Sequence, residues 1–104
     1  MDTTKILAAR FNALDTPVKF SIENYCNNGR MCLDLVTDDE IQEPFATLTV
    51  NIVEARLEEN EIIVKTWSEN ESIAKAALET GLFENTGKLI PTGYVNAQVW
   101  KVLQ

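Results

Sequence analysis

The chain has 104 residues, 45% of them hydrophobic, and a formal net charge of −7. This length supports one hydrophobic core, so we expect a single domain over residues 1–104. No apolar run approaches the roughly 20 residues that span a bilayer, so we expect a cytoplasmic protein with no targeting segment and no membrane contact. Because the chain has no histidine, it lacks the commonest acid–base catalyst and the commonest metal ligand, and we expect no enzymatic activity, no cofactor and no metal site.

The amino-terminal stretch 4–14 is compatible with a helix or with a strand. Leu7, Phe11 and Leu14 have helical spacing, and the following turn residues end the element in either case. Residues 18–26 then alternate apolar and polar side chains, which indicates a half-buried strand.

A hairpin turn follows this strand. Asn28-Gly29 tolerates the positive φ angles of a type I′ turn, and a two-residue loop at this point pairs Asn24 with Leu33. In that register Cys26 and Cys32 lie on opposite faces of the sheet, so we expect free thiols rather than a disulfide.

Further strands are predicted along the rest of the chain. Residues 45–53 alternate again, and residues 61–67 form an apolar, β-branched run. The segment 88–90 is a short strand candidate before a proline, and Thr92-Gly93 is a turn. Residues 94–103 alternate to the end, and we expect this last strand to pair centrally or to close the sheet.

One helix is strongly indicated over about 69–80. Ser68 and Glu71 have the spacing of a capping box, in which each side chain accepts a backbone hydrogen bond of the first turn. Gly81 suits the left-handed position after the last turn. Together the elements predict an α+β fold with a single, mainly antiparallel sheet of about 4–6 strands, one capped helix and an N-terminal helix or strand.

Three segments carry a resemblance to a known family. Leu48-Thr49-Val50-Asn51, Ser68-Glu69-Asn70-Glu71 and the stretch 86–95 occur here in an order that resembles a family of small uncharacterised bacterial proteins, a domain of unknown function common in gut bacteria and their mobile elements. The resemblance covers roughly residues 18–103. It implies a cytoplasmic single-domain protein and supplies no catalytic residue, cofactor or substrate.

The negative charge is concentrated in the middle of the chain. Residues 38–71 contain ten acidic side chains against two basic ones. This disfavours direct binding to nucleic acid and favours a basic protein partner, although a plain solvated surface has the same pattern. We interpret the chain as a non-enzymatic accessory or inhibitory protein that binds an unidentified, basic protein through acidic and aromatic side chains. The candidate partner-binding residues are Asp38, Asp39, Glu58, Glu59, Glu61, Trp67, Tyr94 and Trp100.

A second hypothesis is a small-molecule or metal-binding domain. Asn51, Glu69, Asn70 and Glu71 would supply hard oxygen ligands if the third strand ends beside the start of the helix. Helix capping, helix-dipole and turn interactions explain the same residues without a ligand. The partner, the oligomeric state and the sheet order do not follow from the sequence.

Overall fold

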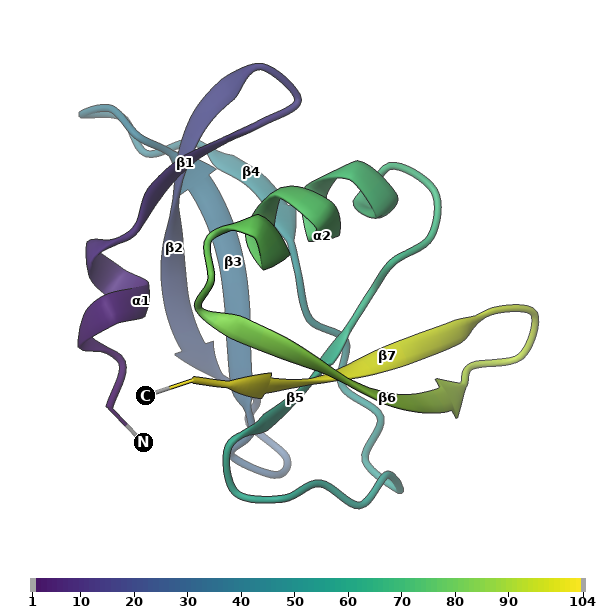
Figure 1. Cartoon of the computed structure of the whole chain (residues 1–104). Helices are drawn as coiled ribbons and strands as arrows, with labels where there is room; N and C mark the ends of the chain where they lie inside the picture. Colours follow the sequence, from purple (N-terminus) through teal and green to yellow (C-terminus); the bar gives the residue numbers. More distant parts are fainter. Residues whose placement is uncertain (1, 104) are drawn as a thin grey trace.

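The computed structural model describes residues 2–103, in which antiparallel strands predominate over two helices (Figure 1). In chain order the elements are α1 (Thr4–Ala8), β1 (Arg10–Ala13), β2 (Thr16–Asn24), β3 (Met31–Thr37), β4 (Pro44–Thr47), β5 (Glu61–Val64), α2 (Asn70–Glu79), β6 (Phe83–Pro91) and β7 (Asn96–Val102). The α+β class expected from the sequence is confirmed. Within residues 2–103, neither helix has the length and apolar character needed to cross a membrane.

The strands form two sheets, so the prediction of a single sheet is wrong. Sheet A has the strand order β1-β2-β3-β4, and sheet B has the order β5-β7-β6. All neighbouring strands are antiparallel. The last strand, β7, is central in sheet B, which confirms one of the two positions expected for it.

The predicted strand 45–53 divides between the two sheets because the chain leaves sheet A after β4. The Leu48 N–H donates to the Leu33 carbonyl of β3 at 2.8 Å, whereas the Leu48 carbonyl accepts from the Lys65 N–H, just after β5, at 3.0 Å. Thr49 then forms an isolated bridge with the last residue of β5. Leu48 and Thr49 are both buried. This short segment therefore joins the sheets, and a simple alternation of faces does not describe it.

The hairpin between β2 and β3 is shifted by two residues from the predicted register, since Asn24 pairs with Met31 rather than with Leu33. The loop is longer than Asn28-Gly29, and the Gly29 N–H donates to the Tyr25 carbonyl at 2.8 Å. Because side chains alternate with a period of two, this shift leaves each side chain on its predicted face. Both cysteines are free thiols.

The amino-terminal stretch contains both of the elements considered for it. The five-residue helix α1 is followed by strand β1. Ile6 of α1 is only 1% exposed, whereas Leu7 and Leu14 are 49% and 55% exposed. The helical spacing of the leucines therefore did not identify the residue that enters the core.

Helix α2 lies close to its predicted position, but it begins without the predicted capping box. The structure has no side-chain cap at its first turn, and Ser68 has a left-handed φ of 55°. Asn70 instead anchors the start of the helix, because its Nδ2 donates to the Thr47 carbonyl of β4 at 2.9 Å. Gly81 has a φ of 78° and ends the helix as expected.

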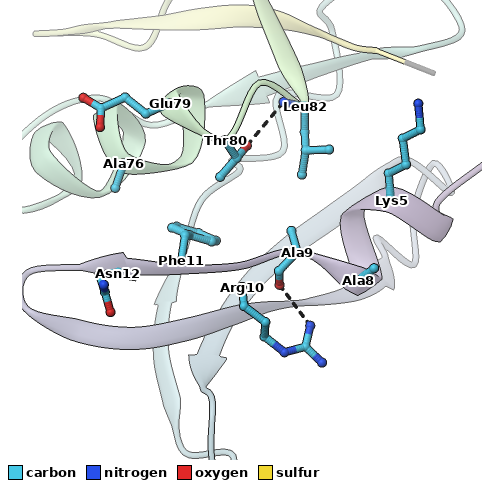
Figure 2. A pocket seen from close by; sticks show the side chains of 10 residues that line it. All are labelled: Lys5, Ala8, Ala9, Arg10, Phe11, Asn12, Ala76, Glu79, Thr80 and Leu82. Carbon is cyan, nitrogen blue, oxygen red and sulfur yellow. Dashed lines mark hydrogen bonds between the residues drawn. The ribbon is translucent and has the colours of Figure 1, made fainter.

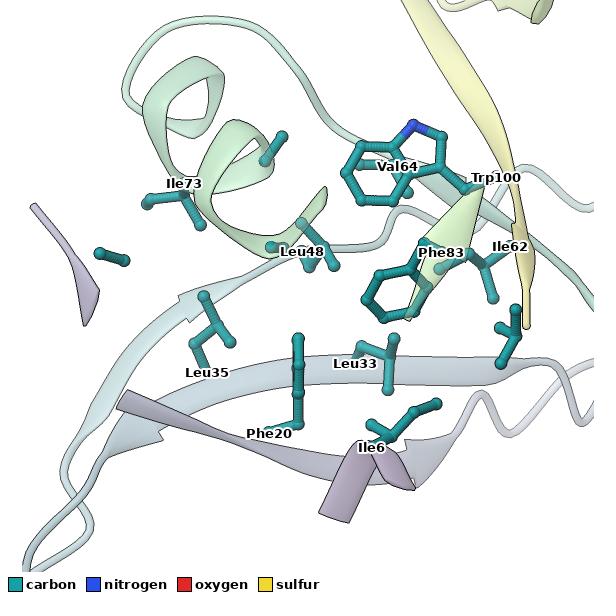
Figure 3. Close-up of a cluster of buried hydrophobic side chains, with 14 of the residues drawn as sticks. Ile6, Phe20, Leu33, Leu35, Leu48, Ile62, Val64, Ile73, Phe83 and Trp100 are labelled. Carbon is teal, nitrogen blue, oxygen red and sulfur yellow. The ribbon is translucent and has the colours of Figure 1, made fainter. Parts of the chain in front are cut away.

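The core lies between sheet A, sheet B and α2 (Figure 3). Side chains of all three layers meet there, including Leu35 from β3, Ile73 from α2 and Trp100 from β7. An aromatic row crosses it, since the ring centroids of Phe20 and Phe83 are 5.7 Å apart and those of Phe83 and Trp100 are 5.6 Å apart. Edge and tilted contacts at these distances stabilise beyond the area that they bury.

Candidate functional site

The predicted acidic residues lie at two opposite ends of sheet A. Asp38 and Asp39 follow the end of β3 that pairs with the start of β2, whereas Glu58 and Glu59 line a hollow beside the Asn28 loop at the other end (Figure 1). Six residue steps along β2 separate these ends, or roughly 20 Å at about 3.3 Å per residue. The two acidic runs therefore do not form one contiguous face.

The acids after β3 have local structural partners. Asp38 forms an ion pair with Arg10, with Nε and Oδ1 at 3.2 Å. Asp39 Oδ1 accepts from the Gln42 N–H, the Thr37 hydroxyl and the Ile41 N–H at 2.8, 2.9 and 3.1 Å. These bonds hold the pKa of Asp39 below its ordinary value. Asp39 thus organises the turn between β3 and β4.

Glu61 is also engaged within the chain, and its side chain is only 6% exposed. Its carboxylate accepts from Lys88 Nζ at 2.7 Å and from the Glu58 N–H at 2.8 Å. Burial acts to raise the pKa of Glu61, but these bonds and the positive charge of Lys88 outweigh it, so the pKa lies below its ordinary value. Glu58 and Glu59 remain as exposed acids at this end of the molecule.

The three predicted aromatic residues have different environments. Trp100 is 1% exposed and lies in the core, so it is unavailable to a partner and its assignment to the binding surface is corrected. Trp67 is half-buried. Tyr94 is fully exposed, at 106% of its reference area. The structure does not bring these aromatic side chains together on one surface.

Tyr94 and the adjacent Val95 lie in the turn of the β6–β7 hairpin, and a further exposed apolar residue, Leu89, lies earlier in β6, where it pairs with Gln98 of β7. Leu89 is 56% exposed and Val95 is 37% exposed. The turn is closed by the Thr92 N–H and the Thr92 hydroxyl, which both donate to the Val95 carbonyl at 2.9 and 2.7 Å. The hairpin projects on the side of the molecule opposite α1 (Figure 1). We call Leu89, Tyr94 and Val95 the hairpin tip.

The sequence identified Tyr94 but not its two apolar neighbours in this tip. Leu89 belongs to the predicted short strand 88–90, and Val95 belongs to the predicted last strand 94–103, on the face opposite Tyr94. The available signal is the turn Thr92-Gly93 itself, because the residues beside a hairpin turn lie at the end of the sheet.

The residues of the second hypothesis do not converge. Asn51 is held by the β2–β3 loop, since it accepts from Asn28 Nδ2 at 2.9 Å and donates to Asn27 Oδ1 at 2.8 Å. Glu69 and Glu71 lie exposed at the start of α2. Within residues 2–103 no group of three or more cysteine, aspartate or glutamate side chains is arranged to hold a metal ion.

One polar network lies beside the segment that joins the sheets. The Tyr25 hydroxyl is 3.0 Å from Thr49 Oγ1, which also accepts from the Leu33 N–H at 3.1 Å. Burial raises the pKa of Tyr25 to about 12. Tyr25 therefore stays protonated at neutral pH, and its hydroxyl serves as a structural hydrogen-bonding group.

A hollow lies between the α1–β1 arm and the second half of α2 (Figure 2). It has a volume of about 640 Å³. Figure 2 shows Phe11 pointing from the α1–β1 arm toward α2, with Ala76 of α2 facing it and Ala9 beside it on the same arm. Its lining also includes the polar residues Lys5, Arg10, Asn12, Glu79 and Thr80.

Comparisons with protein-family models, with curated proteins and with solved structures give no match. The resemblance to the gut-bacterial family therefore stays a prediction.

Proposed function

We propose that this protein is a non-enzymatic accessory or inhibitory protein that binds a basic protein partner, with the hairpin tip as its main contact. The exposure of Leu89, Tyr94 and Val95 carries the proposal. Exposed apolar side chains on one projecting hairpin suit a role in protein binding, and tyrosine is enriched among the residues that dominate binding energy.

Two features of the chain support this choice of surface and partner. The tip is preorganised, because two hydrogen bonds to the Val95 carbonyl close its turn, so little conformational entropy is lost on binding. The net charge of −7 attracts a basic protein over long range. The exposed acids Glu58 and Glu59 contribute to this attraction without forming the contact itself.

The test combines partner capture with two matched surface variants. The protein captures partners from a bacterial lysate, and the affinity of the purified partner is then measured by calorimetry. Tyr94→Ala should weaken binding about 30-fold, equivalent to about 2 kcal/mol, because truncation of an anchoring aromatic residue has this effect. Ile41→Ala is the control, since Ile41 is 74% exposed in the loop between β3 and β4. Equal affinities of the Tyr94 variant and the wild type would refute the role of the tip.

Charge reversal tests the proposed electrostatic attraction separately from the contact at the hairpin tip. Glu58→Lys with Glu59→Lys should slow association and reduce its dependence on salt, while dissociation changes little. The same reversal at Asp38 and Asp39 should have a smaller effect on association, because these acids already have partners within the chain.

A further inference from the structure

The loop between β2 and β3 contains the only Asn-Gly pair of the chain, Asn28-Gly29. Both residues are exposed to solvent. Within residues 2–103, no atom apart from those of its chain neighbours lies within 4 Å of the position that a Cβ on Gly29 would occupy. Asparagine before glycine is prone to deamidation, because glycine has no Cβ to hinder the approach of its backbone nitrogen to the asparagine side chain. Asn28 is therefore a reactive amide in an open position.

Deamidation at this pair begins with a bond between the Gly29 backbone nitrogen and Cγ of Asn28. The Cγ–Nδ2 bond breaks, and Nδ2 leaves as ammonia while the Gly29 amide proton passes to water. Water then adds to one of the two carbonyl carbons of the resulting succinimide and breaks the bond from that carbon to the Gly29 nitrogen. Opening at Cγ gives aspartate, whereas opening at the main-chain carbonyl gives isoaspartate, whose main chain is one carbon longer. Water is the only co-reactant, and nothing is oxidised or reduced.

Three side-chain amides hold Asn28 in place. The Arg30 N–H donates to Asn28 Oδ1 at 3.1 Å, and because a backbone N–H only donates, this bond fixes which end of the amide is the oxygen. Asn28 Nδ2 therefore faces Asn51 and donates to its Oδ1 at 2.9 Å. Asn51 Nδ2 in turn donates to Asn27 Oδ1 at 2.8 Å. We call Asn27, Asn28 and Asn51 the amide chain.

The attacking nitrogen is also engaged. The Gly29 N–H donates to the Tyr25 carbonyl at 2.8 Å, and closure of the succinimide ring requires the loss of this proton. Arg30 ties the loop to the chain between the two sheets, since its guanidinium donates to the Ile52 carbonyl at 2.8 Å and to the Ala55 carbonyl. The reaction therefore has to start from an opened loop, and its rate follows the population of that open form.

We propose that Asn28 is a deamidation site and that the amide chain sets the rate of this modification by holding the loop closed. The product adds a negative charge in the hollow that Asn28 shares with Glu58 and Glu59. Aspartate fits the closed loop once the amides of Asn51 and Asn27 turn over, because a carboxylate accepts a hydrogen bond where Nδ2 donated one. Isoaspartate lengthens the main chain within the loop and disrupts it. This inference concerns a covalent change and does not depend on the proposed partner.

The test follows the full chain in mildly alkaline buffer, with peptide mapping by mass spectrometry to locate the deamidated residue. The same chain unfolded in urea gives the rate of the open loop. Folded wild type should react at least about 30-fold more slowly than this reference, because opening the loop breaks several hydrogen bonds. Asn51→Ala removes two of them and should speed the folded reaction about tenfold.

Two further variants separate the amide chain from a general loosening of the fold. Asn51→Asp still accepts from Asn28 but no longer donates to Asn27, so its rate should lie between those of wild type and Asn51→Ala. Asn12→Ala is the matched control, because it removes an exposed amide from β1 at the opposite end of sheet A. Its rate should stay within about twofold of wild type. Thermal unfolding of each variant shows that the fold is retained.

Several results would overturn the proposal. Equal rates for folded and unfolded wild type would show that the loop gives no protection. Wild-type rates for Asn51→Ala, or equal rates for Asn51→Asp and Asn51→Ala, would remove the bond to Asn28 as the cause. The same acceleration by Asn12→Ala would indicate general loosening. Product that maps mainly to another residue, or no product in urea, would remove Asn28 as the site.

Discussion

Replacing Trp100 with alanine distinguishes a core role from a surface role for this residue. Trp100 is 1% exposed, and its ring centroid lies 5.6 Å from that of Phe83. Truncation of such a buried aromatic side chain costs about 3–5 kcal/mol through lost contacts and the cavity left behind. Its Nε1–H also donates to Gln98 Oε1 at 3.0 Å, but Gln98 retains Asn85 as a donor at 3.3 Å. The cavity is therefore the dominant loss.

This loss is large compared with the roughly 5–15 kcal/mol by which domains of this size are stable. Urea unfolding followed by circular dichroism measures the change in the free energy of unfolding, and the fluorescence of Trp67, the remaining tryptophan, reports the same transition. Tyr94→Ala is the matched control, and its stability should stay within about 0.5 kcal/mol of wild type because Tyr94 is fully exposed.

The outcome that refutes this reasoning is a loss of less than about 1 kcal/mol for Trp100→Ala, since no packed aromatic residue is removed so cheaply. A destabilisation by Tyr94→Ala equal to that of Trp100→Ala would contradict the separation of core and tip. Either result would return Trp100 to the list of surface candidates.

Two further predictions concern the β1–β2 turn and the buried carboxylate. Leu14 and Asp15 form a two-residue hairpin loop and have left-handed φ angles of 49° and 62°. Asn and Gly adopt such angles at lower cost, so the double variant Leu14→Asn, Asp15→Gly should raise the free energy of unfolding by about 1 kcal/mol in urea titrations. A decrease in this free energy would contradict the turn geometry. The folded-state pKa of Glu61 is lowered, so its stabilising contribution is present above its ordinary pKa and is lost as pH falls through the folded value. Lys88→Met should therefore destabilise the protein at neutral pH, and this loss should shrink as the pH falls through the folded-state pKa of Glu61; a loss that is independent of pH across the acidic range would exclude this ion pair as the cause.

Local periodicity predicted the strands whose two faces have different environments. In β2 and β3, Phe20, Leu33 and Leu35 face the core, and their polar neighbours face outward, as the alternation indicates. The same reasoning failed for β7, where Val99 and Trp100 are adjacent and both buried. A strand that is packed against other elements on both faces no longer alternates apolar and polar residues, and the sequence alone does not reveal that packing.

The helix start shows a second limit of local reasoning. Ser68 and Glu71 have the right spacing for a capping box, but the bond from Asn70 to the Thr47 carbonyl fixes the entry to α2 instead. This bond joins segments 23 residues apart. Propensity rules describe neighbours in sequence, so a tertiary hydrogen bond of this kind overrides them without leaving a local pattern.

The pairing of buried polar atoms and the exposure of several apolar side chains favour recognition by apolar contact. Within residues 2–103 every buried side-chain polar atom already has a hydrogen-bond partner within the protein. Several large hydrophobic side chains are exposed, with Tyr94 fully exposed and Leu89 more than half exposed. Their burial against a partner is favourable at about 25 cal/mol per Å² of apolar surface, whereas exposed charge pairs contribute little. The proposed function therefore assigns the binding energy to the hairpin tip and the rate of encounter to the negative charge.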